Sequence, residues 1–174
     1  KASISAGMSV NRILPFRLRR MVGPFIFMDH AGPVEIPVAQ AANLDVLPHP
    51  HIGLSTVSYL FGGQVTHRDS LGVEMVVKPG EVNWMTAGRG IAHSERTPEY
   101  LRHTDKILHG LQIWVALPKA LEQMKPEFFH VEEKDIPSWE QDGVNIKLIA
   151  GEAFGKKSPV PVYSPLYFLE VKNN

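Results

Sequence analysis

Short runs of β-branched and aromatic residues, each closed by a turn rich in Gly, Pro, Asp or Ser, repeat from Gly53 onward and constrain the fold most strongly. Regular spacing of this kind is typical of a sandwich or barrel. The sequence therefore predicts an all-β fold with at most short helices. The strands expected in this region cover residues 54–61, 64–69, 73–77, 82–86, 108–117, 128–131 and 145–150.

Three connecting segments carry further expectations. Gly62-Gly63 is a hairpin signal, so residues 64–69 are expected to return beside residues 54–61. Residues 29–48 are rich in Ala, Pro and Gly, which predicts a long loop. Residues 118–124 begin with proline and continue with good helix formers, which predicts a helix of about one or two turns.

Two pairs of alternating polar residues are candidate metal ligands. His49 and His51 lie two residues apart in an extended stretch, and His93 and Glu95 repeat the same spacing. Because alternate side chains of a strand point to the same face, each pair is expected to present both side chains together. Three imidazoles and one carboxylate suit Fe(II), Mn(II), Ni(II), Cu(II) or Zn(II), whereas Ca(II) and Mg(II) prefer oxygen ligands. The sequence thus predicts a transition-metal site.

The composition excludes cysteine-based sites and argues against several classes of protein. The 174 residues include no cysteine, so disulfides, thiolate ligands and a cysteine nucleophile are excluded. The 18 basic and 18 acidic residues cancel, which removes the global positive field of a dedicated nucleic-acid binder. No apolar run approaches the roughly 20 residues that span a bilayer, and the N-terminus does not resemble a signal peptide. We therefore expect a cytoplasmic protein without membrane partners, or a nuclear one in a eukaryote.

Other conspicuous polar and aromatic residues have simpler interpretations. Four histidines are expected to be ordinary polar residues with a hydrogen-bond partner: His30, His67, His103 and His130. Four further residues are expected to pack in the core or at its rim, with pocket lining as the alternative: Trp84, His109, Gln112 and Trp114. Clustered arginines near the N-terminus predict a solvated face: Arg12, Arg17, Arg19 and Arg20.

Three segments resemble, in order and spacing, the pirin family of the cupin superfamily: HPHIGLSTVSYLFGG, KPGEVNWMTAGRGIAHSE and HGLQIWVALP. The likeness continues through Asp142-Gly-Val and Gly151-Glu-Ala-Phe-Gly155, so it covers most of the chain. The resemblance implies a cupin jelly-roll β-barrel, also called a double-stranded β-helix, whose mouth holds a mononuclear non-haem metal, usually iron. By matching motifs, the metal ligands would be His49, His51, His93 and Glu95.

Pirins typically contain two cupin domains, and the resemblance extends only to the start of the second. It implies that residues 1–160 form the N-terminal metal-binding domain and that residues 161–174 form the linker and first strand of an otherwise absent second domain. The strand expected at residues 166–171 is apolar on both faces. We expect it to pair either with the first barrel or with another chain in a dimer.

The resemblance implies two functions from different classes. The first is an oxygenase like quercetin 2,3-dioxygenase, with a flavonol and O₂ as substrates and Fe(II) as the expected metal. Four protein ligands leave octahedral positions free on the metal, and Glu95 would accept the flavonol hydroxyl proton. The second is a non-enzymatic iron-binding redox sensor that docks on transcription factors or metabolic enzymes. A zinc-dependent sugar isomerase on the same barrel is a more distant alternative.

Overall fold

The computed structural model describes residues 2–5, 8–39 and 45–173. Strands dominate these ranges, and short 3₁₀ turns lie at Glu99–Leu101, Lys119–Leu121 and Glu133–Asp135. Within the described ranges, no helix is long and apolar enough to cross a membrane. The all-β class predicted from the sequence is confirmed.

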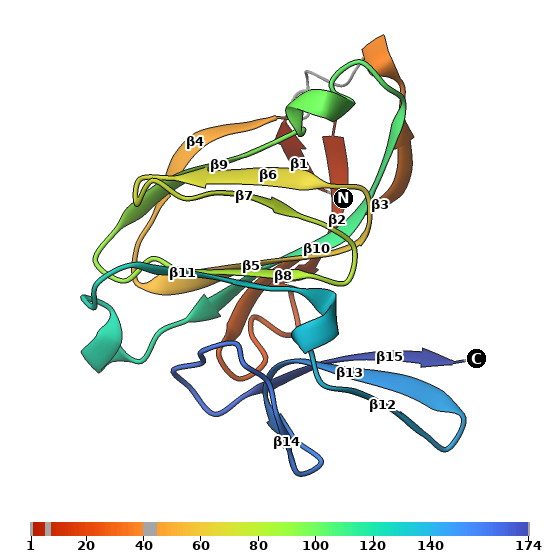
Figure 1. Ribbon diagram of the computed structural model, residues 1–174. Coiled ribbons are helices and arrows are strands. Elements are labelled where there is room, and N and C mark those ends of the chain that lie inside the picture. The colour runs from red at the N-terminus through yellow and green to blue at the C-terminus, as the bar shows by residue number, and fades with distance from the viewer. Residues whose placement is uncertain (1, 6–7, 40–44, 174) are drawn as a thin grey trace.

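Two antiparallel sheets face each other and form the walls of a barrel (Figure 1). One sheet has seven strands in the order β1 (Ala2–Ser5), β2 (Met8–Leu14), β3 (Phe25–Ile36), β10 (Lys106–Ala116), β5 (Leu54–Gly62), β8 (Val82–Thr86) and β11 (Glu127–Val131). The opposite sheet has four strands in the order β4 (Val46–His51), β9 (Ile91–Arg96), β6 (Val65–Asp69) and β7 (Glu74–Val77).

A third sheet covers the outer face of the seven-stranded sheet (Figure 1). It contains β12 (Ser138–Gln141), β13 (Val144–Ala153), β14 (Lys156–Lys157) and β15 (Tyr167–Asn173). The main core lies between these two layers and includes Val57, Tyr59, Trp84, Ile113 and Ile149. Because the central strands of the large sheet are covered on both faces, both sets of alternating side chains are sheltered, and every residue of β8 is buried.

The Gly62-Gly63 pair does not form the expected hairpin. β5 pairs with β8 and β10, whereas β6 pairs with β7 and β9, so the two glycines carry the chain from one sheet to the opposite one. Gly63 has a φ of +83°, in the left-handed region that glycine adopts readily. The glycine signal correctly marks a sharp turn, but it does not specify which sheet receives the next strand.

The long loop expected at residues 29–48 is also wrong over most of its length. β3 continues to Ile36 and β4 begins at Val46, while residues 40–44 lie outside the described residues. Gly32 has a φ of +76° and lies at an irregularity in the register between β3 and β10. A β-bulge therefore accommodates the Gly-Pro pair without ending the strand. The helix expected at residues 118–124 is a single 3₁₀ turn, Lys119–Leu121.

The apolar strand expected at residues 166–171 is β15. It pairs antiparallel with β13, from Gly151 opposite Tyr167 to Val144 opposite Asn173. β15 thus joins the third sheet of the same chain, whereas the sequence led us to expect pairing with the first barrel or with another chain. Phe168 packs against the core, whereas Tyr167 and Val171 are 61% and 58% exposed. The domain division at residue 160 and a dimer through this strand stay predictions.

We expect Gly63→Ala to lower the free energy of unfolding by about 2 kcal/mol more than Gly72→Ala, because only the first substitution creates a severe clash. Both glycines have similar positive φ angles, +83° and +86°. A Cβ at Gly63 would lie 2.1 Å from the carbonyl oxygen of Ile107, whereas a Cβ at Gly72 would meet nothing within 4 Å. Urea denaturation of both variants measures the difference. Equal losses would show that the backbone relieves the clash at little cost.

Candidate metal centre

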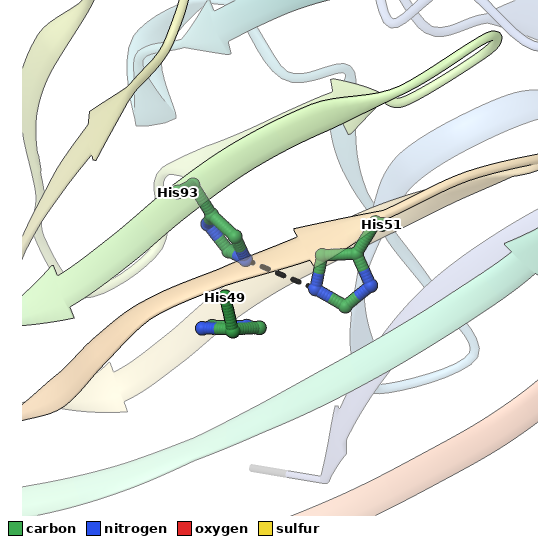
Figure 2. A group of neighbouring side chains, drawn as sticks. All are labelled: His49, His51 and His93. Atoms are coloured by element: carbon green, nitrogen blue, oxygen red, sulfur yellow. Dashed lines mark hydrogen bonds between the residues drawn. The ribbon is translucent and has the colours of Figure 1, made fainter.

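Three histidines meet on the inner wall of the four-stranded sheet (Figure 2). His49 and His51 come from β4, and His93 comes from the neighbouring strand β9, directly opposite His49 in the register. One ligand-capable atom from each residue lies within 4.8 Å of the other two. Among the described residues, this is the group of at least three His, Cys, Asp or Glu side chains whose spacing suits a metal ion.

The ring nitrogens of these histidines converge. His49 Nδ1 lies 2.9 Å from the carbonyl oxygen of Leu47, which only accepts, so Nδ1 carries the proton and Nε2 offers its lone pair. His51 Nε2 and His93 Nε2 lie 3.1 Å apart (Figure 2). All three residues therefore bring an imidazole nitrogen toward one point, as a transition metal requires.

The electrostatic setting of the cluster favours neutral imidazoles. Burial, and secondarily the nearby His49, lower the pKa of His51 to about 4. Burial is also the largest cause that lowers the pKa of His93 to about 2, followed by the three histidines around it. A neutral imidazole offers the lone pair that binds a metal, whereas a protonated one does not. The donor chemistry of the cluster thus fits a divalent transition metal at neutral pH.

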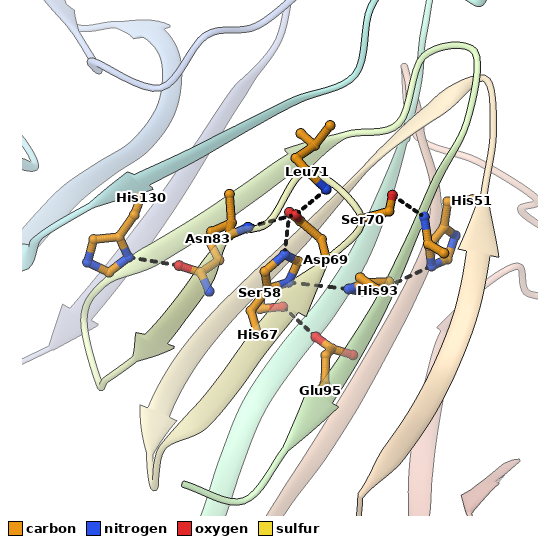
Figure 3. A network of polar contacts seen from close by, with 12 residues as sticks. His51, Ser58, His67, Asp69, Ser70, Leu71, Asn83, His93, Glu95 and His130 are labelled. Atoms are coloured by element: carbon orange, nitrogen blue, oxygen red, sulfur yellow. Dashed lines mark hydrogen bonds and ion pairs between the residues drawn. The ribbon is translucent and has the colours of Figure 1, made fainter.

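Glu95, the fourth ligand predicted from the sequence, lies two residues after His93 on β9 but outside this close group. The Ser58 hydroxyl, from β5 on the opposite sheet, donates a hydrogen bond of 2.9 Å to Glu95 Oε1 (Figure 3). Ser58 Oγ also lies 3.0 Å from the side-chain Oε1 of Gln112. Glu95 borders the same cavity as His49 and His51. Its roles as ligand and base stay predictions.

The cavity between the two sheets has a volume of about 710 Å³ and is bordered by His49, His51 and Glu95. Small-molecule sites commonly have volumes of about 300–1,000 Å³. The Phe27 and Trp114 rings, which line this cavity, stack with their centroids 4.2 Å apart. The edge-on contact of Trp114 with His51, at 5.3 Å between centroids, connects this aromatic wall to the histidine cluster.

The sequence left two alternatives for Trp84, His109, Gln112 and Trp114, packing in the core or lining a pocket, and the structure distinguishes them. Gln112 and Trp114 line the cavity, whereas Trp84 is buried in the main core. His109 does not line the cavity, and its Nε2 lies 3.0 Å from Nε2 of His30.

Arg12 is more than part of the solvated face expected from the arginine cluster. Its guanidinium donates two hydrogen bonds of 2.9 Å to the carboxylate of Asp29, and both residues line the cavity. The Asp29 side chain is only 2% exposed, so the bidentate pair balances a buried charge in the cavity wall.

Comparison with known proteins settles the family. A family model described as pirin matches residues 7–115. The chain belongs to the pirin family. A pirin-like protein from Caulobacter vibrioides is 55% identical over 161 residues, which are 92% of this chain and 56% of that protein.

Two crystal structures match nearly the whole chain. A quercetin 2,3-dioxygenase from Acinetobacter baumannii matches with a TM-score of 0.89 and 43% identity, covering 98% of this chain and 54% of that one. A second quercetin 2,3-dioxygenase structure from the same organism matches with a TM-score of 0.86 and 31% identity, covering 98% and 60%. The cupin β-barrel predicted from the resemblance is confirmed. This pirin chain spans about half the length of the curated relatives it matches.

Two polar residues behind the cluster are not anticipated by the sequence interpretation. His67 and Asp69 lie on β6, which pairs with β9 so that Asp69 is opposite His93. His67 has the hydrogen-bond partner expected from the sequence, because its Nε2 lies 2.9 Å from Asp69 Oδ2. Its second contact was not expected: His93 Nδ1 lies 3.3 Å from His67 Nδ1. The available signal is the His67-Arg-Asp69 spacing, which repeats the two-residue spacing of the ligand pairs in this pirin.

Proposed function

We propose that this pirin is a metal-dependent oxygenase of the quercetin 2,3-dioxygenase type, with a flavonol and O₂ as substrates. The observation that carries the proposal is that the histidine cluster and Glu95 border one aromatic-walled cavity of about 710 Å³. The two Acinetobacter baumannii structures described as quercetin 2,3-dioxygenases support the same reaction class.

We propose that His49, His51, His93 and Glu95 hold the metal and that Fe(II) is the native ion. The cluster supplies imidazole nitrogens with available lone pairs, and Glu95, which borders the same cavity, would supply an oxygen donor. Mn, Ni, Cu and Zn accept the same donor set and are expected as substitutes. When bound, the metal would supply a Lewis acid and redox centre for reaction with O₂.

The cavity residues bind and orient the substrate in this proposal. The stacked rings of Phe27 and Trp114, together with Leu60 elsewhere in the lining, offer apolar surface to a flat polyphenol and exclude water from the reacting end. Glu95 accepts the flavonol hydroxyl proton, and the Ser58 hydroxyl holds its carboxylate at the cavity wall. The deprotonated flavonol is electron-rich and therefore more reactive toward O₂.

Iron-loaded protein is expected to consume quercetin and O₂ together under aerobic conditions, because a dioxygenase incorporates O₂ into its substrate. The measurement follows flavonol absorbance and dissolved O₂ in the same sample. Protein stripped with a chelator is the control, and readdition of Fe(II) is expected to restore turnover.

A protein that binds iron at the cluster but leaves a panel of flavonols unchanged would contradict the oxygenase proposal. That outcome would favour the non-enzymatic iron-binding alternative, in which a partner protein reads the state of the metal. The division into a metal-binding domain at residues 1–160 and the start of a second domain at residues 161–174 is a separate proposal, and the turnover measurement does not depend on it.

A further inference from the structure

We infer that His67 and Asp69 are positioning residues that hold His93 in its metal-binding tautomer through a buried chain of hydrogen bonds (Figure 3). The inference rests on the proposed metal site and assigns a role to two residues behind it. His93 Nδ1 lies 3.3 Å from His67 Nδ1, and His67 Nε2 lies 2.9 Å from Asp69 Oδ2. We call these three side chains the relay.

The carboxylate end of the relay is fixed by the backbone. Asp69 Oδ1 accepts hydrogen bonds from the N–H groups of Leu71, at 2.8 Å, and Val73, at 3.2 Å. These donors belong to the turn that joins β6 to β7. The Asp69 side chain is fully buried, so Oδ2 finds its partner in His67 rather than in bulk water.

The middle of the relay is fixed by packing. His67 is 3% exposed, and its ring stacks on Phe128 with the centroids 4.5 Å apart. The register between β6 and β9 places His67 opposite Glu95 and Asp69 opposite His93. The His67 ring therefore stands between a strand that carries candidate ligands and a carboxylate anchored by a turn.

When His67 is neutral, the order of hydrogen-bond donors and acceptors determines which ring nitrogen of His67 and of His93 carries the proton. The Asp69 carboxylate only accepts, so His67 carries its proton on Nε2 and has a lone pair on Nδ1. That lone pair accepts from His93, so His93 carries its proton on Nδ1 and has a lone pair on Nε2. His93 Nε2 is the atom that faces His51, which is the position expected for a metal. The relay thus selects the tautomer that binds a metal.

Asp69→Asn is expected to reverse this order with almost no change of shape. The single amide oxygen of Asn would keep the two backbone donors of Leu71 and Val73, because two hydrogen bonds outweigh one. Its NH₂ group would then face His67 Nε2 as a donor and push the His67 proton onto Nδ1. The His67 Nδ1–H would in turn favour His93 with its proton on Nε2, which blocks the metal-binding nitrogen.

The test compares Zn(II) affinity in wild type, Asp69→Asn and Ser70→Ala, by competition with a chromophoric chelator. Asp69→Asn is expected to weaken binding by about 10–100-fold, the usual effect of losing an outer partner of a metal-binding histidine. Ser70 lies in the same turn and accepts a hydrogen bond of 3.2 Å from the N–H of Ala92, next to His93, but it lies outside the relay. Ser70→Ala is therefore the matched control, expected within about threefold of wild type.

Nitrogen-15 NMR of the histidine rings in wild-type protein gives a readout that a purely structural role would not produce. His67 is expected to be protonated on Nε2 and His93 on Nδ1, both without metal and with Zn(II). A His67 proton found on Nδ1 overturns the inference even if Asp69→Asn fails to fold. If wild type and a folded Asp69→Asn variant bind Zn(II) equally tightly, the relay is overturned but the metal site is not. If wild type binds no Zn(II), both the metal site and the relay are overturned.

Discussion

His93→Ala and His49→Ala are each expected to weaken binding of a divalent transition metal by more than about 100-fold, because loss of a direct ligand costs more than loss of its outer partner. Each substitution removes one of three imidazole nitrogens that converge within 4.8 Å. His93 is 2% exposed, so its truncation also leaves a cavity in the protein interior. His49 is only half-buried, so His49→Ala removes a candidate ligand with a smaller loss of packing. Elemental analysis and competition titrations measure the effect, with wild type expected to hold about one ion per chain.

His130→Ala is the matched control for these two variants. His130 is a half-buried histidine on β11 whose Nδ1 lies 2.8 Å from Asn83 Oδ1, away from the cluster. The His130→Ala variant is expected to bind as much metal as wild type, although it also loses a histidine hydrogen bond. Undiminished metal in both His49→Ala and His93→Ala would refute the assignment of the cluster as the metal site.

The sequence predicts the three-histidine cluster well because its geometry depends on local rules. Alternation along a strand places His49 and His51 on one face and does the same for His93 and Glu95. What alternation cannot supply is the pairing of β4 with β9, which puts His49 opposite His93. That step comes from the resemblance to pirins, since four strands, β5 to β8, lie between β4 and β9 in the sequence.

The sequence is less informative where a residue's role depends on which sheet or layer it faces. Gly62-Gly63 marks a turn, yet the chain crosses to the opposite sheet there because the barrel closes around the cavity. Along β10, the alternation of Ile113 and Trp114 identifies two faces, but an apolar pattern does not distinguish a packed core from a lined cavity. Both faces of β10 are sheltered from solvent, and only the position of the third sheet shows which face packs in the core.

His67 and Asp69 illustrate a further gap between pattern and role. Their two-residue spacing matches that of the candidate ligands, but they lie on β6, one strand farther from the histidine pair of β4. From β6, His67 contacts His93 and Asp69 contacts His67, so neither residue is part of the cluster. A spacing rule finds residues that share a face, and only the strand order separates the candidate ligands from the residues that contact them.

Glu95→Gln is expected to reduce flavonol oxidation per bound metal by about 10²–10⁴-fold, the usual contribution of a general base. Glutamine keeps the shape of the side chain, and its amide oxygen still accepts from the Ser58 hydroxyl, which now holds Glu95 at 2.9 Å. It also retains one weaker oxygen donor for a metal, so metal affinity is expected to fall much less than activity. Steady-state rates on iron-loaded variants, divided by their measured iron content, separate the two effects.

A control must show that the effect of Glu95→Gln comes from the position of this carboxylate and not from the loss of one negative charge on the protein. Glu140→Gln makes the same substitution at an exposed position on β12, in the sheet that does not border the cavity, and is expected to leave the rate per iron unchanged. Ser58→Ala keeps the carboxylate but removes the hydrogen bond that orients it, so an intermediate rate is expected if position as well as charge matters. Full activity per bound iron in Glu95→Gln would exclude Glu95 as the base and leave it, at most, a ligand.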